Sequence, residues 1–384
     1  MNNKQFKEQL DLAKKRGLSF DERIERKAVN GLSGMYAKAN IPRGTVLASY
    51  PVQNQIQVRT DINYPEAASH NFKYIHAAAT ELSKGNKSQH LDVLLSLEPF
   101  SDLQKKCTYF YSEAELSLIN QLNPILARNI LESKKQIQSR VDAIASFDPK
   151  LDSRIVLRVL LNMQSRAFAG FGFASVIDAF NHSDREGNPV RALDNEATTI
   201  GFTAHKDYAP GEQICTTYDR KDMYAHAIAY NYFDETGTHF IDYGARILQT
   251  AVTPLDHKVL EYTSKFYKLS SSSFNGITQY TVKDQELFFL ENAPGTKLID
   301  YVRRNCFQTA GELLSGKCTE KSFTDRLLGI LNELIQVNKV DEFALDDIPK
   351  KMHRFYHLLK KEKHMLIANR NWVLDNRSAE TRGH

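Results

Sequence analysis

The sequence predicts an α+β fold in two lobes, because strand-like and helix-like stretches alternate in large blocks along the chain. Two glycine-containing, strand-like blocks at residues 24–51 and 171–218 flank a block of helical periodicity at about residues 62–161. Most of the last third of the chain is again helical in pattern. We therefore expect a β domain over residues 1–240 that carries the helical insert, followed by an all-α domain over residues 241–384.

The first strand-like block follows a short predicted helix at residues 3–16, in which Phe6 and Leu10 share one face. Between residues 24 and 51, glycines and the turn Pro42-Arg43-Gly44 separate short apolar runs. Such runs, bounded by turn residues, are typical of short strands joined by tight turns. This block therefore predicts the first strands of the β domain.

The helical blocks are recognised by apolar residues at three- and four-residue spacing. This spacing covers residues 74–82, 90–97, 112–143 and 153–166 in the insert, and residues 323–337 and 348–369 in the last third. Ser112, followed by Glu113 and Glu115, is a typical helix start, because a serine caps free amides and acidic groups favour the positive end of the helix dipole. The run Ser270–Ser273 is interpreted as a short linker.

Composition indicates a globular protein that can bury a large core. Of the 384 residues, 42% are hydrophobic and 25% are charged, which is ordinary for such a protein. The net charge of +4 is small for this length, so nucleic acid is not an expected partner. No window approaches the roughly 18 consecutive apolar residues of a membrane span, and the first residues contain no apolar leader. We expect a monomer in the cytoplasm; the alternative is a secreted bacterial effector acting in a host cytosol.

The four cysteines argue against a structural metal site. Cys107, Cys215, Cys306 and Cys318 are widely spaced, and none is part of a Cys-x-x-Cys pair. Structural zinc needs closely spaced ligands. No cluster of histidine, cysteine and aspartate in the sequence has metal-binding spacing either. We therefore expect no metal, and scattered thiols fit a reducing compartment.

The most informative segment is an apolar run that ends in the polar sequence Asp178-Ala179-Phe180-Asn181-His182-Ser183. Polar groups at the end of a buried strand need partners. The segment is followed by Gly211-Glu212-Gln213-Ile214, which predicts a turn and a short strand, and then by Tyr218. The ordered set Asp-x-x-Asn-His-Ser, Gly-Glu-Gln-Ile and Tyr therefore supplies candidate functional residues.

In this order of residues the chain resembles the carboxyl half of the SET domain. It is similar to the subgroup of the plant Rubisco large-subunit lysine methyltransferase and the animal actin-histidine methyltransferase. Further segments that carry the resemblance are Gly31–Ala37, Ser165-Arg166-Ala167-Phe168 and Tyr230-Asn231-Tyr232-Phe233. The chain departs from the family pattern at Leu32 and Asn231, where the family has glycine, and at Ser175, where it has proline.

The resemblance implies a SET-domain β fold with a pseudoknot, and the cofactor S-adenosylmethionine, whose methyl group is transferred to a protein side chain. It implies that Tyr218 is catalytic, with a hydroxyl that holds the methyl group through weak C–H···O contacts. The helical domain would dock the protein substrate. The implied cofactor-binding residues are Gly34, Tyr36, Arg166, Asp178, Asn181 and His182, and the implied substrate-binding residues are Tyr230 and Tyr232.

The same residue types also have ordinary structural interpretations. Arg166 offers a planar charged fork that suits a carboxylate, yet an arginine at a helix end is often a surface residue. Asn181 can cap a polar turn, and Gly34 can serve a plain hairpin turn. Asp178 can orient a turn, and Tyr218, like the other candidate tyrosines, can belong to the core.

From the broader family we expect a protein-lysine N-methyltransferase. The first alternative is a protein-histidine N-methyltransferase acting on actin or a similar protein, because residues 233–239 also resemble the actin-directed branch. The second is a catalytically inactive SET-like interaction module, because Leu32, Met223 and Asn231 depart from the family pattern.

Overall fold

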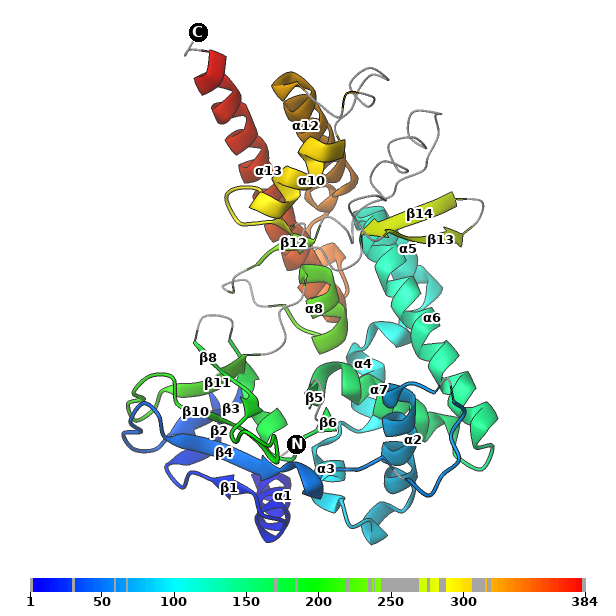
Figure 1. Cartoon of the computed structure of the whole chain (residues 1–384), viewed down its shortest axis with the longest axis vertical. Helices are drawn as coiled ribbons and strands as arrows, with labels where there is room; N and C mark the ends of the chain where they lie inside the picture. Colours follow the sequence, from blue (N-terminus) through cyan, green and yellow to red (C-terminus); the bar gives the residue numbers. More distant parts are fainter. Residues whose placement is uncertain are drawn as a thin grey trace. The chain divides into compact units, whose positions relative to one another are not determined.

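A computed structural model describes most of the chain, and Figure 1 shows the order of its elements. The described residues are 3–29, 32–58, 60–66, 68–168, 172–183, 186–217, 222–233, 237, 239–242, 269–274, 277–282, 288–305, 315 and 319–381. The chain divides into two compact units. The first comprises Met1–Tyr111, Ile130–Arg220 and Ile228–Asn231, and the second comprises Ser112–Asn129, Lys221–Ala227 and Tyr232–His384. Each unit is therefore assembled from segments that are far apart in sequence.

Two sheets form the β part of the first unit (Figure 1). One has the strand order β1-β4-β10-β9, and the other has the order β2-β3-β11-β7, with β8 paired to β11 beside this path. A separate short pair joins β5 and β6. The strands are β1 Ser19–Phe20, β2 Ile24–Val29, β3 Leu32–Ala37, β4 Val46–Pro51, β5 Ala167–Phe168, β6 Gly172–Phe173, β7 Asn181–His182, β8 Gly187–Pro189, β9 Arg191–Ala192, β10 Thr199–Thr203 and β11 Gln213–Thr217.

Strand β11 is the link between the two sequence regions singled out above. It runs antiparallel to β3 with Gln213 opposite Tyr36. It also runs parallel to β7 with Cys215 opposite Asn181, and parallel to β8. Parallel neighbours cannot be joined by a tight turn, and here the connection contains β8, β9 and β10. The glycine hairpin β2–β3 and the Asn-His segment therefore lie in one sheet.

One hydrophobic core fills the space between these strands and helix α1, Asn3–Lys15. The helix confirms the amphipathic pattern predicted for residues 3–16. Phe180 packs edge-on against Phe202 with ring centroids 4.8 Å apart. Fully burying a side chain of this size stabilises the fold by about 1.5–3 kcal/mol. Members of this core are Phe6, Ala13, Met35, Tyr50, Val176, Ile177, Phe180 and Phe202.

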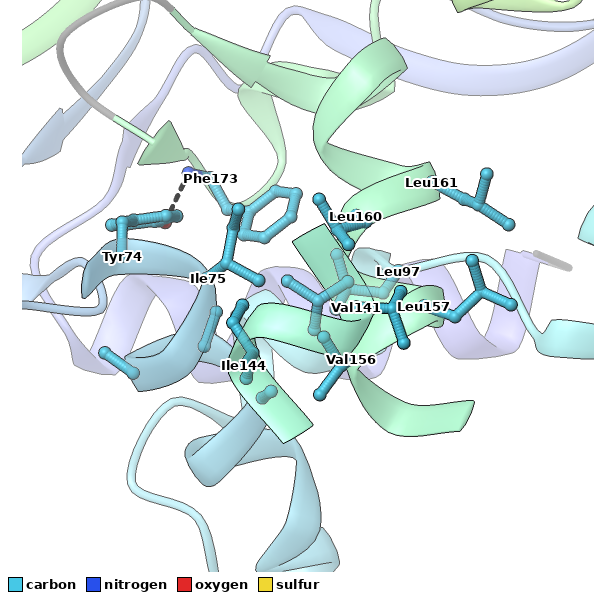
Figure 2. Close-up of a cluster of buried hydrophobic side chains, with 14 of the residues drawn as sticks. Tyr74, Ile75, Leu97, Val141, Ile144, Val156, Leu157, Leu160, Leu161 and Phe173 are labelled. Carbon is cyan, nitrogen blue, oxygen red and sulfur yellow. Dashed lines mark hydrogen bonds between the residues drawn. The ribbon is translucent and has the colours of Figure 1, made fainter. Parts of the chain in front are cut away.

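The helical insert of the first unit has its own core, shown in Figure 2. Its helices are α2 His70–Ser83, α3 Leu91–Ser96, α4 Phe100–Lys106, α7 Ser153–Arg166 and the part of α6, Pro124–Phe147, from Ile130 onward. The unit also contains the short 3-10 turns η1 Val52–Asn54, η2 Gly85–Lys87, η3 Thr108–Phe110 and η4 Ile177–Ala179. The Phe173 amide donates to the Tyr74 hydroxyl over 2.8 Å. Gly172 has φ +76°, and a Cβ there would lie 2.3 Å from the Tyr74 side chain. Only glycine meets both demands.

The predicted helical stretch at residues 112–143 is two helices. Ser112 starts α5, Glu113–Leu122, with a capping box in which its hydroxyl accepts from the Glu115 amide and the Glu115 carboxylate accepts from the Ser112 amide. Asn123 then leaves the helical conformation, with φ −163°. Its side-chain oxygen accepts from the amides of Ile125 and Leu126, which begins α6 at Pro124.

The second unit is mainly helical, as predicted, but it also contains short strands. Its helices are α5, the start of α6 as far as Asn129, α8 Met223–Tyr230 as far as Ala227, α10 Thr296–Asn305, α12 Glu320–Val337 and α13 His353–Thr381. It also contains the 3-10 turns η5 Val340–Glu342, η6 Leu345–Asp347 and η7 Lys350–Met352, and the strand pairs β12 Ile241–Asp242 with β15 Phe288–Phe289 and β13 Leu269–Phe274 with β14 Ile277–Val282. The run Ser270–Ser273 is therefore part of a strand and not a linker. Its partner β14 is rich in β-branched residues, which favour strands.

A buried polar cluster ties together the three segments of the second unit. The Glu362 carboxylate accepts from the Tyr224 hydroxyl over 2.7 Å and from the Asn338 amide over 3.1 Å. The Asn123 amide donates to the Tyr224 hydroxyl over 2.8 Å. All four side chains are at most 2% exposed. We call these four residues the Glu362 cluster.

No helix within the described ranges is both long enough and apolar enough to cross a membrane.

Candidate functional site

The candidate site is built around Gly34 in strand β3, which pairs with Lys27 of β2. A Cβ at this position would lie 2.5 Å from Gln213 Nε2, 3.0 Å from Asn181 Nδ2 and 3.1 Å from the Tyr36 ring. Such distances leave no room for a side chain, so the position needs glycine because of close approach. Side chains from β3, β7 and β11 therefore meet at one point. We call Gly34, Tyr36, Asn181 and Gln213 the Gly34 cluster.

Asn181 is fixed to the hairpin by its own side chain. Its Nδ2 donates to the Ser33 main-chain oxygen over 2.9 Å. The neighbouring His182 is buried and pairs with the buried Thr216 in the parallel ladder of β7 and β11. Two of the predicted cofactor-binding residues, Asn181 and Gly34, thus lie together, and His182 follows in the same strand.

Tyr36 is nearly buried beside Gly34, with 8% of its surface exposed. Lys27 pairs with Gly34 across the hairpin, and its Nζ lies 4.7 Å from the centroid of the Tyr36 ring. A lysine at this distance from a tyrosine face gives a cation–π contact. One face of the Tyr36 ring is therefore covered by a cation from the preceding strand.

Arg166 and Asp178 form a second group of predicted residues. Arg166, the last residue of α7, contacts Asp178 Oδ2 through one guanidinium nitrogen over 3.3 Å. The other nitrogen contacts Glu98 Oε1 over 2.8 Å, and Glu98 also forms an ion pair with Lys106. The structure thus brings Arg166 and Asp178 together. It also shows two carboxylates at the guanidinium that was predicted to bind a cofactor carboxylate.

The pKa values of the two carboxylates in this group are shifted in opposite directions. Burial raises the pKa of Asp178 above its usual value, against the opposing effect of the Arg166 charge. Burial also acts to raise the pKa of Glu98, but the charges of Arg166 and Lys106 outweigh it and hold this pKa below its usual value. Burial therefore favours the neutral form of Asp178, and the two neighbouring cations favour the charged form of Glu98.

The family glycine that this chain replaces by Asn231 now has a conformational explanation. Helix α8 ends at Tyr230, and Asn231 follows with φ +58°. Asparagine tolerates this left-handed conformation better than most residues with a side chain. Its amide donates to Cys107 Sγ over 3.5 Å. The substitution therefore preserves the turn that a glycine would make.

These observations agree with the comparison to known families. Residues 33–219 match the family model described as the SET domain. The described part of this range has the fold of the SET domain. No curated protein sequence matches the chain.

Solved structures with the fold of the SET domain cover nearly the whole chain. The crystal structure of the SET domain of LSMT bound to lysine and AdoHcy has a TM-score of 0.67 and 13% identity, over 97% of this chain and 92% of that one. Rubisco LSMT bound to sinefungin and monomethyllysine has a TM-score of 0.60 and 13% identity, over 98% and 93%. Rubisco LSMT bound to AdoMet has a TM-score of 0.61 and 13% identity, over 97% and 92%. The α+β fold class and the resemblance inferred from the sequence are thereby confirmed.

The three remaining predicted site residues are tyrosines. Tyr218 lies outside the described residues, which stop at Thr217 and start again at Asp222. Tyr230 is half-buried at the end of α8. Tyr232 is half-buried and its ring lies 5.5 Å from that of His226. The roles of these tyrosines stay predictions.

Sequence reasoning assigned no individual role to Gln213 and did not single out Glu98. Gln213 belongs to the Gly-Glu-Gln-Ile segment and lies directly opposite Tyr36. Only the register of β3 against β11 reveals this pairing. Glu98 comes 68 positions before Arg166, and no local pattern connects them. Within the described part of the chain, no group of three or more His, Cys, Asp or Glu side chains is arranged to hold a metal ion.

The Gly34 cluster fits a small polar ligand better than a metal. Its polar atoms are side-chain amides and main-chain groups, which can donate and accept hydrogen bonds together. Asn181 and Gln213 are partly exposed, so a ligand can reach them. The adjoining Tyr36 ring and the glycine allow close approach of an apolar or planar group.

Proposed function

We propose that this protein is an S-adenosylmethionine-dependent protein methyltransferase and that its acceptor is a lysine side chain. The SET-domain match and the SET-domain fold support S-adenosylmethionine-dependent methyl transfer. The choice of lysine rests on the family resemblance, and two similar structures contain bound lysine or monomethyllysine.

The observation that carries this proposal is the convergence of Gly34, Asn181 and Gln213 at one point. Gly34 and Asn181 belong to the two sequence segments that resemble the cofactor-binding parts of the family. They lie 147 positions apart, and only the shared sheet with β11 brings them within contact. This convergence supports the proposed assignment of these residues to cofactor binding.

We assign the cofactor to this cluster and its neighbours. Asn181 and His182 would hold its amino-acid and adenine ends, Gly34 would let the main chain approach it, and Tyr36 would line it. Asp178 would orient the turn before Asn181 through its contact with Arg166. The Arg166 guanidinium already contacts Glu98 and Asp178. It would bind the cofactor carboxylate in addition to these two side chains.

The bound cofactor would supply an electrophilic methyl group on a cationic sulfur. The protein then has to align a neutral amine with it and exclude water. We propose that the Tyr218 hydroxyl holds the methyl position through weak C–H···O contacts. Tyr230 and Tyr232 would wall the lysine channel, and an apolar wall lowers the pKa of a lysine and favours its neutral form.

The helical region after residue 240 is proposed to dock the protein substrate, with domains at 1–240 and 241–384. Its long helices α12 and α13 contain buried apolar residues and exposed polar ones, so these two helices offer a folded surface. We further propose that the protein acts as a monomer in the cytoplasm.

The test starts with the cofactor. Calorimetry should show that S-adenosylhomocysteine binds the wild type, and that Asn181→Ala weakens binding about tenfold because one hydrogen bond to the ligand is lost. Asn40→Ala, an exposed asparagine of the same unit, is the matched control and should bind as the wild type does. Absence of binding to the wild type at high micromolar ligand would instead support an inactive interaction module.

The acceptor is identified by transfer of a tritiated methyl group into a cell lysate, followed by mass spectrometry of labelled proteins. Label on lysine supports the proposal. Label on histidine, in actin or a similar protein, would replace lysine by the histidine alternative while leaving the cofactor assignment intact.

A further inference from the structure

Val176 has an uncommon backbone conformation two residues before Asp178. Its dihedral angles are φ +69° and ψ −38°, in the left-handed region that favours glycine. Valine is disfavoured there because it is branched at Cβ, and Val176 is also completely buried. A strained residue of this kind persists only where the surroundings enforce its conformation.

The residue before the turn is held on two sides. Ser175, which is fully buried, donates its hydroxyl to the Asp92 main-chain oxygen over 3.1 Å. The same hydroxyl accepts from Gln9 Nε2 over 3.2 Å. Gln9 belongs to α1, and Asp92 belongs to α3. One serine therefore fastens the turn to the first helix and to the helical insert.

The residues after the turn are held as well. The Ala179 amide donates to the Val176 oxygen over 3.0 Å, which closes η4. Asp178 is fixed by Arg166 over 3.3 Å. Two residues after Ala179, the Asn181 side chain reaches the Ser33 oxygen over 2.9 Å. Among the described residues 172–183, Val176 is the only non-glycine residue with a positive φ. It lies between strand β7 and Ser175, whose bonds to Gln9 and Asp92 we call the clamp.

We propose that the left-handed turn at Val176, enforced by Ser175 and Gln9, is a positioning element that sets Asn181 and His182 against the β2–β3 hairpin. Val176 is not one of the proposed cofactor-binding residues; it would act by fixing where β7 begins. Preorganised binding groups lose less freedom when a ligand binds, so affinity depends on this enforcement. The inference rests on the proposed cofactor site.

A pair of substitutions isolates the turn from the loss of side-chain volume. Val176→Ala and Val176→Gly both remove the valine methyl groups, but alanine retains the unfavourable conformation and glycine adopts it freely. We expect Val176→Gly to melt at or above the temperature of Val176→Ala. We also expect Val176→Gly to bind S-adenosylhomocysteine roughly tenfold more weakly than Val176→Ala, because the glycine lets the turn move.

Val156 provides the matched control pair, because it is equally buried but lies inside helix α7. Glycine is unfavourable in a helix interior, so Val156→Gly should melt roughly 2 °C or more below Val156→Ala. Both control variants should bind S-adenosylhomocysteine within about twofold of the wild type. The order of melting temperatures should therefore reverse between the two sites.

Ser175→Ala and Gln9→Met give a second measurement that does not alter Val176. Each removes one bond of the clamp, and we expect S-adenosylhomocysteine affinity to fall roughly fivefold with Ser175→Ala and less with Gln9→Met. Equal affinity of Val176→Ala and Val176→Gly, or unchanged affinity in Ser175→Ala, overturns the inference. Failure of the wild type to bind S-adenosylhomocysteine overturns the proposed function instead, so the two failures are distinguishable.

Discussion

The two units each contain a polar cluster made of residues from distant segments, and the clusters differ in exposure. In the Glu362 cluster every side chain is at most 2% exposed, and the neighbouring donors converge on one carboxylate. In the Gly34 cluster Asn181 and Gln213 are partly exposed, and the hairpin contributes main-chain groups. A closed and satisfied cluster stabilises a fold, whereas an open one retains capacity for a ligand.

The largest expected effect is on the closed cluster. Glu362→Ala leaves the Tyr224 hydroxyl and the Asn338 amide buried without their acceptor, so we expect a loss of about 3 kcal/mol in the free energy of unfolding. Urea unfolding followed by circular dichroism measures this loss. S-adenosylhomocysteine affinity should stay within about twofold of the wild type.

Glu342→Ala is the control for this change, because Glu342 is an exposed glutamate of the same unit. Its effect on stability should stay within about 0.5 kcal/mol. If the two alanine variants were equally stable, the closed cluster would not be the stabilising feature described above.

The open cluster should respond in the opposite way. Gly34→Ala forces a Cβ to within 2.5 Å of the Gln213 amide, so the amides must move apart. We expect S-adenosylhomocysteine to bind about tenfold more weakly, with a loss of only about 1 kcal/mol in stability, since the residues that must move are partly exposed. Calorimetry and urea unfolding give the two values.

Gly329→Ala provides the contrast, because Gly329 is exposed in α12 and its Cβ would meet open space. Alanine should stabilise this helix by about 0.5–1 kcal/mol without a change in ligand affinity. A Gly34→Ala variant with wild-type affinity would contradict the assignment of the cofactor to the Gly34 cluster.

For the charged group at Arg166 we expect an effect of intermediate size, and the pH dependence of stability can measure it. The pKa of Glu98 is held below its ordinary value of 4.5, so its contribution to stability is present above that pH and is lost as the pH falls through the lower folded-state pKa. Glu98→Gln should therefore lower stability at pH 7 by about 1 kcal/mol and flatten the decline below pH 4.5. Urea unfolding between pH 3 and 7 tests this. Glu132→Gln, which alters an exposed pair with Lys135, should follow the wild-type curve.

The smallest effect is expected at an exposed ion-pair group of the second unit. Hydrogen bonds from Lys360 and Lys363 lower the pKa of Asp341 to about 2, so its contribution is present above the ordinary value of 3.8 and is lost as the pH falls towards 2. Because the side chain is 52% exposed, solvent screening limits this contribution to about 0.5 kcal/mol at pH 7. Asp341→Asn should show this loss in dilute buffer and almost none in 1 M salt. A difference that persisted in salt would show a contribution other than charge.

Much of the secondary structure followed from local sequence. The amphipathic helix at the start, the glycine hairpin, the serine cap at residue 112 and the helix ending at Arg166 all lie where local patterns predicted them. Capping and periodicity act within a few residues, so one sequence is enough to detect them. The interpretation of Ser270–Ser273 as a linker was wrong, because this strand depends on pairing with β14 and a run of serines does not predict such pairing.

The sequence alone identified the candidates for the cofactor site, because the order of its motifs resembles that of the SET domain. Tertiary structure decided how they are used. It placed Gln213 beside Gly34 and Asn181, gave Arg166 two carboxylate partners, and enforced the left-handed turn at Val176. Each of these features depends on contacts between segments far apart in the chain, and the free energy of such contacts is set by the packed fold and not by local residue preferences.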